Sequence, residues 1–315
     1  MSKVLSKIAN EVINVKMSLW GGYLPVKLKI WLLKNVFGQK TGKRSTDELW
    51  CFNDKIRWSM MFDNTPLKIK CADKFAVREY VAERIGEKYL AKLYGVFERP
   101  EDVDFAGLPN KFILQCNASS GRQIIVEDRR QLDQRAAMRA MRRWARSVYG
   151  RNKGEMAYSL MPKKIIAREL MDIRADREVL FMCFAGRVEY IRTVIYSHTL
   201  GHKKCAGERY YSREWGDAGF QKVNTPLAPS TPRPEKLDLM IGLAEKLAAG
   251  FNHVRVDFFE LVNGEVRFAE MTFYNWTGGE VYEPVGADYK LGLLFRLPPR
   301  DADGFSEEGR RTLGL

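Results

Sequence analysis

The chain has 315 residues, of which 45% are hydrophobic and 12% aromatic, so it can build a real core and has the length of about two domains. Its net charge of +13 favours polyanionic partners, namely nucleic acid, acidic lipid, acidic polysaccharide or phosphorylated substrates. The five cysteines are scattered, without a CxxC pair or a Cys/His cluster, which argues against a zinc site and indicates reduced thiols in a cytoplasmic protein. No signal-peptide pattern and no apolar run of about 18 residues is present, so no membrane span is expected.

The first 44 residues differ from the rest of the chain in charge. They hold nine Lys or Arg residues and one acid, Glu11, interleaved with large apolar residues. Within them, Lys27–Phe37 fits a basic amphipathic helix that can lie on an anionic membrane surface. A helical extension packed on the main domain, with its lysines in solvent, explains the pattern equally well.

The remaining elements mix helices and strands without a regular βαβ repeat. Helices are predicted over residues 45–63, with Ser45 or Thr46 as N-cap, over Cys71–Ile85 with Gly86 as C-cap, over Leu132–Tyr149 closed by Gly150, and within Arg233–Ala249. Strands are predicted over Tyr89–Val96, Lys111–Cys116, Ile124–Glu127, Lys164–Glu169, Glu178–Phe184 and Arg187–Tyr196, the last two joined by a turn at Ala185-Gly186. The order favours an α+β fold over a doubly wound parallel sheet.

Two features of the first half are candidates for phosphate binding. Asn117–Gly121 is a small polar loop between strands, whose backbone N–H groups and hydroxyls can cover phosphates; an ordinary hairpin turn has the same composition. Lys74 and Arg78 are one helical turn apart and point the same way, either toward a phosphate or into solvent.

Two other polar segments have weaker signals. The predicted helix at 132–149 is the centre of an arginine run, but no nucleic-acid-binding motif accompanies it, so a docked helix with a solvated basic face is the default. Residues 196–215 are predicted to form a long polar loop, a type of segment that is often functional. His198 and His202 in it are candidate acid/base groups, although lone histidines more often make ordinary hydrogen bonds.

A predicted hairpin near the C-terminus is the most informative pattern. Asn263-Gly264, between alternating apolar runs, indicates a two-residue type I′ turn. That turn places Asp257 opposite Glu270, Arg255 opposite Thr272, Phe259 opposite Phe268 and Glu260 opposite Arg267. The face with Val254, Val256, Phe258, Ala269, Met271 and Phe273 is predicted to be core.

The facing carboxylates need a compensating charge. Opposed residues have Cβ atoms about 4.5–5.5 Å apart, and like charges at that distance destabilise a sheet. A divalent cation with carboxylate ligands would offset the repulsion. The alternative is that Arg255 neutralises both acids.

Taken together, the motifs resemble a known family. They run in the order DK..VR.YV from Asp73, LP.KFIL.CN..SG from Leu108, PK.II..EL from Pro162, CF.G from Cys183, then HT, RYY and W, and finally VRVDFF and E.TFY. The order and spacing resemble the TupA-like branch of the ATP-grasp superfamily, which is linked to teichuronopeptide and other surface-polysaccharide biosynthesis. The resemblance covers about residues 47–298.

The resemblance implies a fold of two α+β lobes that grip ATP. The implied metal ligands for Mg²⁺ are Asp257 and Glu270, with Thr272 in the place of an asparagine. The implied ATP contacts are Lys74 at the phosphates, the loop with Asn117, Ser119, Ser120 and Gly121 as a lid, and a hinge of Arg168, Glu169, Leu170 and Met171 at the adenine. Arg255 is placed to stabilise the transferred phosphoryl group or an acyl phosphate, with His198 and Arg209 as further candidate catalytic residues.

The sequence departs from the family at two cationic positions. Gln115 stands where the family carries a second phosphate-binding lysine, and Glu178-Val-Leu180 replaces an acid-x-Lys pattern. A neutral amide cannot replace a point charge at a phosphate. Arg122 or Arg168 would have to compensate, or the ability to use ATP is weakened.

These observations predict a helical extension at 1–70, a small ATP-grasp lobe at 71–162 and a large lobe with the metal site at 163–315. The leading functional hypothesis is an ATP- and Mg²⁺-dependent ligase that joins an amine, such as an amino acid, to a uronic acid of a bacterial surface glycan or lipid-linked precursor. The alternatives are a glycosyltransferase or kinase of polysaccharide assembly and a degenerate ATP-grasp module that binds glycan or membrane. Nucleic acid is not an expected partner.

Overall fold

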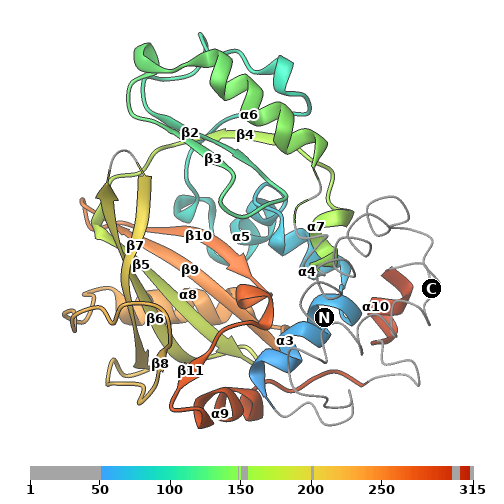
Figure 1. The fold of residues 1–315 in the computed structure, drawn as a ribbon, viewed down its shortest axis with the longest axis vertical. Coiled ribbons are helices and arrows are strands. Elements are labelled where there is room, and N and C mark those ends of the chain that lie inside the picture. Colours follow the sequence, from blue (N-terminus) through green and yellow to red (C-terminus); the bar gives the residue numbers. More distant parts are fainter. Residues whose placement is uncertain (1–50, 148, 150–154, 200–201, 300–305, 313–315) are drawn as a thin grey trace, which may run out of the picture.

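The computed structural model describes residues 51–147, 149, 155–199, 202–299 and 306–312. The described residues form two larger antiparallel sheets and a two-stranded one, with helices around them, so the predicted α+β class is confirmed (Figure 1). The predicted basic extension, the amphipathic segment at 27–37, the N-caps Ser45 and Thr46, and the C-cap Gly150 lie outside the described residues. None of the described helices combines the length and the apolar character that crossing a bilayer requires.

From residue 51 onward, three helices precede the first sheet: α3 (Phe52–Phe62), α4 (Pro66–Ala72) and α5 (Val77–Ile85). The single helix predicted over 71–85 is therefore wrong, because Asp73 interrupts it. Its Oδ1 accepts hydrogen bonds from the backbone N–H groups of Phe75 (2.7 Å) and Ala76 (3.0 Å), which is the local alternative to helix that aspartate offers. Lys74 consequently lies in a turn, and only Arg78 lies on α5. Gly86, with φ 103°, ends α5 as predicted.

The small lobe is a four-stranded sheet in the order β1-β4-β2-β3. Its strands are β1 (Leu93–Phe97), β2 (Phe112–Cys116), β3 (Gln123–Val126) and β4 (Ile165–Arg168). Helix α6 (Gln134–Arg146) buries Ala137 and Met141 in a core with Phe112 and Leu114. The shorter α7 (Met156–Leu160) follows it. The opposite face of this sheet carries Gln115 and Arg168 and turns toward the second lobe.

The large lobe is a five-stranded sheet in the order β10-β9-β5-β6-β7. Its strands are β5 (Ile173–Phe184), β6 (Arg187–Thr199), β7 (His202–Ser212), β9 (His253–Leu261) and β10 (Val266–Thr272). Helix α8 (Leu237–Ala248) packs on one face (Figure 1). Ala185 (φ 47°) and Gly186 (φ 80°) form the predicted turn between β5 and β6.

The prediction of a long loop at 196–215 is wrong, because most of this segment is strand β7, which pairs with β6. Within it Tyr210 and Tyr211 are buried, at 2% and 3% exposure, although polar residues surround them in the sequence. The polar composition thus hides a strand whose aromatic residues are packed. The shorter elements are β8 (Gln221–Lys222) and β11 (Tyr282–Glu283), which pair as a two-stranded sheet, followed by α9 (Gly286–Leu294) and α10 (Glu307–Thr312).

The structure also shifts the lobe boundaries proposed from the sequence. Strand β4 lies between β1 and β2, so the small sheet extends past residue 163 to Arg168. At the other end, Cys71, Val77 and Tyr80 share the core of the large lobe with Phe181 and Phe258. The helices at 66–85 are therefore packed with the large lobe, because their apolar sides complete its core.

Candidate active site in the cleft between the lobes

The β9–β10 hairpin brings Asp257 opposite Glu270 and Arg255 opposite Thr272, as predicted. The turn itself differs from the prediction. Gly264 (φ 78°) donates its N–H to Leu261 O and Glu265 O accepts from Leu261 N–H, which makes a three-residue loop closed by a glycine bulge. This loop shifts the pairing by one residue.

A second irregularity restores the predicted register. A bulge lies between Phe268 and Glu270, so Phe268 pairs with Phe258 before the bulge, and the acid pair is aligned after it. The predicted pairs Phe259–Phe268 and Glu260–Arg267 are therefore wrong: the observed partners of Phe259 and Glu260 are Arg267 and Val266. Phe268, and not Ala269, joins Val256, Phe258 and Met271 in the main core.

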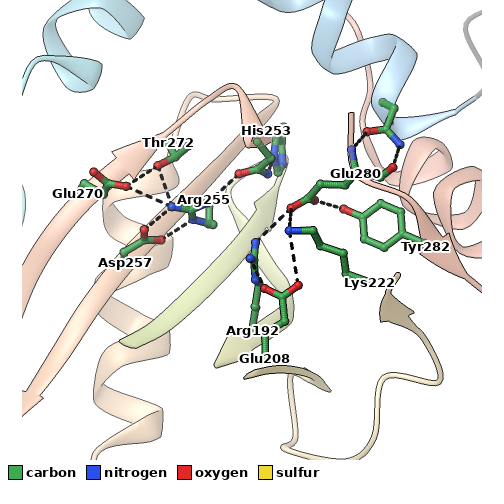
Figure 2. Close-up of polar contacts among 12 residues, drawn as sticks. Arg192, Glu208, Lys222, His253, Arg255, Asp257, Glu270, Thr272, Glu280 and Tyr282 are labelled. Atoms are coloured by element: carbon green, nitrogen blue, oxygen red, sulfur yellow. Dashed lines mark hydrogen bonds and ion pairs between the residues drawn. The ribbon is translucent and has the colours of Figure 1, made fainter. Parts of the chain in front are cut away.

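Arg255 is the centre of the acid cluster (Figure 2). Its Nη2 lies 2.6 Å from Asp257 Oδ2, 3.2 Å from Glu270 Oε1 and 3.0 Å from Thr272 Oγ1. Lys74 Nζ lies 3.3 Å from the other oxygen of Glu270. The two acids thus face two cations, and the repulsion between the carboxylates is offset within the protein, as the alternative interpretation of the hairpin had it.

The two carboxyls differ in environment. Asp257 is 2% exposed, and burial raises its pKa to about 6 although the adjacent Arg255 guanidinium acts in the opposite direction. For Glu270, burial would raise the pKa, but Lys74 and Arg255 outweigh it and the net shift is downward. The Glu270 side chain is 35% exposed, so it is an ionised group that solvent can reach.

The donor atoms of this cluster suit a hard divalent cation. Asp257, Glu270 and Thr272 offer two carboxylates and a hydroxyl around one point, and Mg²⁺ is typically bound by one or two carboxylates together with substrate phosphates. Among the described residues, no group of three or more His, Cys, Asp or Glu side chains is placed to hold a metal. The residues therefore fit an Mg²⁺ that takes its remaining ligands from a nucleotide, and do not fit a closed structural site.

A cavity of about 900 Å³ separates the lobes beside this cluster. Its small-lobe wall includes Ile113 and Arg168, and its large-lobe wall includes Glu178 and Phe259. Phe259 follows Asp257 by two residues on β9 and so points to the same face of the sheet. Leu170 and Met171, from the connection between the lobes, line the cavity as well.

A smaller adjoining pocket, which Gln115 lines, is positively charged through other residues. It is lined by Lys74, Arg78, Gln115 and Arg168, and shares Arg168 and Phe259 with the larger cavity. Arg168 Nη1 donates to Glu169 O (3.0 Å), and Arg78 Nη1 donates to Ala91 O (3.0 Å). Neither guanidinium forms an ion pair with another described residue. Burial and the nearby charge of Arg78 lower the pKa of Arg168 to about 10, so it stays charged at neutral pH.

Hydrogen bonds of Asn117 and Ser119 fix the first part of the loop at 117–121. The buried Asn117 donates to Asp73 Oδ2 (2.6 Å) and accepts from Lys164 N–H (2.7 Å), and Lys74 Nζ donates to Ser119 O (2.7 Å). Gly121 has φ 70°, and together with Ser120 it is exposed at the tip. Asn117 and Ser119 thus anchor the loop, and the tip is the part that solvent reaches.

One other predicted catalytic residue, Arg209, lies away from the acid cluster. Arg209 is on β7, in the row of aligned residues that runs across the sheet through Thr193 and Val179 to Phe258. Phe258 follows Asp257 directly on β9, so this row lies on the sheet face opposite to Asp257. Its Nε donates to Ala228 O (2.8 Å). His198 and His202 lie at the ends of β6 and β7, and their side chains fall outside the described part of the chain. Of the predicted catalytic residues, the structure brings Arg255 to the acid cluster.

Asn275 and His253, two residues that the sequence analysis missed, form a hydrogen-bonded chain with Arg255. Arg255 Nη1 donates to Asn275 Oδ1 (3.1 Å), Asn275 Nδ2 lies 3.2 Å from His253 Nε2, and His253 Nδ1 lies 2.9 Å from Cys183 O. This chain is consistent only if Nε2 accepts and Nδ1–H donates, which fixes a neutral tautomer. No sequence pattern signals these contacts, because Asn275 meets Arg255 only through the hairpin.

His253 should leave a signature in the pH dependence of stability. Burial lowers its pKa from 6.5 to about 3. Below pH 6.5 the imidazole binds a proton in the unfolded chain but not in the folded chain. The free energy of unfolding therefore decreases as pH falls, by at most about 1.4 kcal/mol per pH unit. We expect His253→Gln to flatten the stability profile between pH 6.5 and 4 in urea unfolding. Profiles of equal slope for the two proteins would contradict a buried neutral imidazole.

A second charged cluster lies on the same face as the acid pair (Figure 2). Arg192 contacts both Glu208 and Glu280, the latter at 3.2 Å, Lys222 Nζ lies 3.6 Å and 3.7 Å from the same two acids, and Tyr282 donates to Glu280. All four charged side chains are at most 9% exposed. Arg192 aligns with Asp257 through Leu180, so the two clusters are neighbours across strand β5.

Comparison with protein families identifies the family of the chain. A family model described as TupA-like ATPgrasp matches residues 54–296. No curated protein matches the chain in sequence. The structure is similar to N5-carboxyaminoimidazole synthase from Aspergillus clavatus, solved with ADP and 5-aminoimidazole ribonucleotide (14% identity, 65% of this chain, 44% of that chain, TM-score 0.38). It is also similar to an L-amino acid ligase from Bacillus licheniformis (13% identity, 70% of this chain, 45% of that chain, TM-score 0.41). A third similar structure is the D-cycloserine synthetase DcsG (12% identity, 73% of this chain, 70% of that chain, TM-score 0.40). The chain spans less than half the length of the first two.

Proposed function

The chain belongs to the TupA-like ATP-grasp family, and from this premise we propose that it is an ATP- and Mg²⁺-dependent carboxylate–amine ligase. A carboxylate oxygen of the acceptor attacks the γ-phosphorus of ATP, the bond to the bridging oxygen breaks, and ADP leaves. The amine nitrogen then attacks the carbonyl carbon of the acyl phosphate, phosphate departs, and the nitrogen loses a proton. The net products are an amide, ADP and phosphate.

One observation carries this proposal: Asp257 and Glu270 lie abreast with Arg255 and Lys74 in contact, next to a cavity between two lobes. Asp257 and Glu270, with Thr272 beside them, would hold Mg²⁺, which when bound neutralises phosphate charge. Arg255 is the group placed to donate to the oxygens of the transferred phosphoryl or the acyl phosphate. Asn275 and His253 keep its guanidinium in one orientation. Positioning and electrostatics supply most of the catalysis in such a site.

The cavity is proposed to take the nucleotide. The hinge from Arg168 to Met171 would meet adenine through its backbone, and Lys74 with the exposed tip at Ser120 and Gly121 would meet the phosphates. A cavity of about 900 Å³ lies within the range of ligand pockets in general. Arg168 and Arg78 are proposed to supply the charge that Gln115 cannot, because both guanidiniums reach the pocket of Gln115 without a described acidic partner.

This assignment gives a test at Arg168. We expect Arg168→Gln to raise the KM for ATP about 10- to 100-fold, since a hydrogen bond to a charged group contributes about 1.5–3 kcal/mol. The measurement is ADP release against ATP concentration. Arg142→Gln is the matched control, because Arg142 lies on the outer side of the small lobe, paired with Glu101. An unchanged KM for ATP in Arg168→Gln would show that Arg168 does not replace the lysine.

The acceptor is proposed to be a uronic acid of a bacterial surface polysaccharide or of its lipid-linked precursor, and the amine an amino acid. The net charge of +13 supports an acidic acceptor. The reaction would take place in the cytoplasm, with residues 1–44 as a proposed peripheral contact to the membrane. Nucleic acid is not proposed as a partner.

The decisive assay supplies purified protein with Mg-ATP, uronic-acid oligosaccharides and mixed amino acids. The proposal expects ADP together with a new amide mass that needs all three substrates. A phosphorylated sugar without amide would instead indicate a kinase, and a requirement for a nucleotide sugar would indicate a glycosyltransferase. No ADP with any pairing would contradict the ligase.

One observation favours a second candidate, a degenerate ATP-grasp module that binds glycan. Gln115 is buried at 7% exposure in the pocket where the resemblance places a lysine. Calorimetry separates the two candidates: the module predicts glycan binding with no detectable binding of Mg-ATP, whereas the ligase predicts binding of both.

A further inference from the structure

The segment after β10 is strained at two consecutive residues. Trp276 has φ 44° and Thr277 has φ 56°, in the left-handed region that β-branched and bulky residues rarely adopt. Each such residue costs folding free energy and persists only where its surroundings enforce it. The strain therefore calls for an explanation in what the segment presents.

The segment is fixed on both sides of the strained pair. Asn275 is 2% exposed and bonds to Arg255 and His253. Gly278 has φ 65°, and a Cβ there would collide with the backbone oxygen of Asn53. The side chain of Asn53 in turn bonds both backbone groups of Glu280, donating to its carbonyl at 2.7 Å and accepting from its N–H at 3.2 Å.

Between these anchors Trp276 is turned outward. It is 64% exposed, although tryptophan is a residue that folding normally buries. Lys222 Nζ lies 3.9 Å from the centre of its ring, a cation–π contact on one face. Lys222 is itself held by Glu208 and Glu280, which Arg192 also contacts.

The contact with Trp276 suggests a role for the buried charged cluster of Arg192, Glu208, Lys222 and Glu280. Buried ion pairs are expensive to desolvate and are weak evidence for stability, so a rigid network of this kind is better explained by what it positions. Here it fixes Lys222 behind the indole. Asn275, the residue before Trp276, bonds Arg255, so the backbone that carries the indole contacts the proposed reaction centre one residue away.

From these contacts we propose that Trp276 is the acceptor platform, on which the ring of a sugar acid stacks while its carboxylate reaches Arg255. This inference rests on the proposed function for the identity of the carboxylate. A pyranose has an apolar C–H face and polar edges, which matches a fixed, solvent-exposed aromatic face surrounded by polar groups. The platform selects for a cyclic acceptor and disfavours a linear carboxylic acid.

The test measures saccharide affinity in the full-length protein, with a galacturonic acid trisaccharide as the probe, by ligand-observed NMR. We expect Trp276→Ala to raise the Kd about 3- to 10-fold, the size of a lost aromatic contact, and Trp276→Phe to give an intermediate value. Binding of Mg-ATP should not change in either variant. Val281→Ala is the matched control, because Val281 is a nearby residue with similar exposure (55%) and has no place in the platform.

Trp276→Gly distinguishes a binding role from a structural one. Glycine adopts φ 44° without strain, so we expect a Tm at or above that of the wild type together with the same loss of saccharide affinity. A residue kept only for packing would give the reverse, a lower Tm with unchanged affinity.

Several outcomes would overturn the platform. The first is an unchanged Kd in Trp276→Ala, in a protein that still turns over Mg-ATP with acceptor; the ligase then stands without it. The second is a wild type that binds no saccharide probe. The third is a variant that loses co-sedimentation with phosphatidylglycerol vesicles but keeps saccharide binding, which would assign Trp276 to a membrane. If saccharide binding depends on Trp276 while Mg-ATP binding is absent, the platform stands and the ligase fails.

Discussion

Replacement of Asp257 by asparagine, or of Glu270 by glutamine, is expected to lower turnover by about 10²–10³-fold, comparable to the loss of one preorganised electrostatic contact in an active site. Either change removes a charge that is proposed to hold Mg²⁺ and that orients Arg255 through a contact of 2.6 Å or 3.2 Å. The measurement is ADP release at saturating ATP and acceptor over a range of Mg²⁺ concentrations. Excess Mg²⁺ should restore part of the rate.

The matched control is Glu265→Gln, in the turn of the same hairpin. Glu265 is half-exposed and pairs with Arg267, away from the acid pair. We expect this variant to keep the turnover of the wild type, and its Tm reports the cost of a neutralised acid in this hairpin. Turnover that survives in Asp257→Asn and Glu270→Gln would show that the facing acids do no chemistry.

The second large effect is expected in the buried charged cluster. Replacement of Arg192 by methionine leaves Glu208 and Glu280 buried, with Lys222 as the one cation near both among the described residues. Breaking a buried pair in this way typically costs about 3–5 kcal/mol, because an uncompensated charge remains. Urea unfolding should show a lower midpoint at an unchanged slope.

A double variant identifies the cause of that loss. Arg192→Met together with Glu208→Gln removes one charge of each sign, so it should recover part of the stability lost in Arg192→Met alone. Equal instability of the single and the double variant would mean that lost packing, and not unpaired charge, is responsible. A change below about 1 kcal/mol in the single variant would show that the cluster is effectively solvated.

The facing acids could be predicted from the sequence because strand alternation and the Asn-Gly turn restrict the register. The prediction reached the right pair by an incomplete route. The three-residue loop at Val262–Gly264 and the bulge between Phe268 and Glu270 each shift the pairing by one, in opposite senses. Neither has a clear sequence signal, and the visible consequence is that Phe268 enters the core in place of Ala269.

Other features depend on contacts that sequence spacing does not encode. The helix break at Asp73 arises from its hydrogen bonds to two backbone N–H groups. One aspartate in a segment with a helical pattern is too weak a signal to predict this break. Arg78 and Arg168 meet around Gln115 only once α5 and the small sheet are packed on the large lobe. The position of Trp276 depends on anchors from α3, β8 and β9, so local propensity could not predict its exposure.

Asp257 and Glu270 are proposed to hold together the Mg²⁺ that binds the nucleotide phosphates. Calorimetric titration of ADP, with and without Mg²⁺, into the wild type and into the Asp257→Asn/Glu270→Gln double variant tests it directly. If the two acids hold the ion, Mg²⁺ strengthens ADP binding in the wild type and has no such effect in the double variant. An equal dependence on Mg²⁺ in both proteins would contradict it.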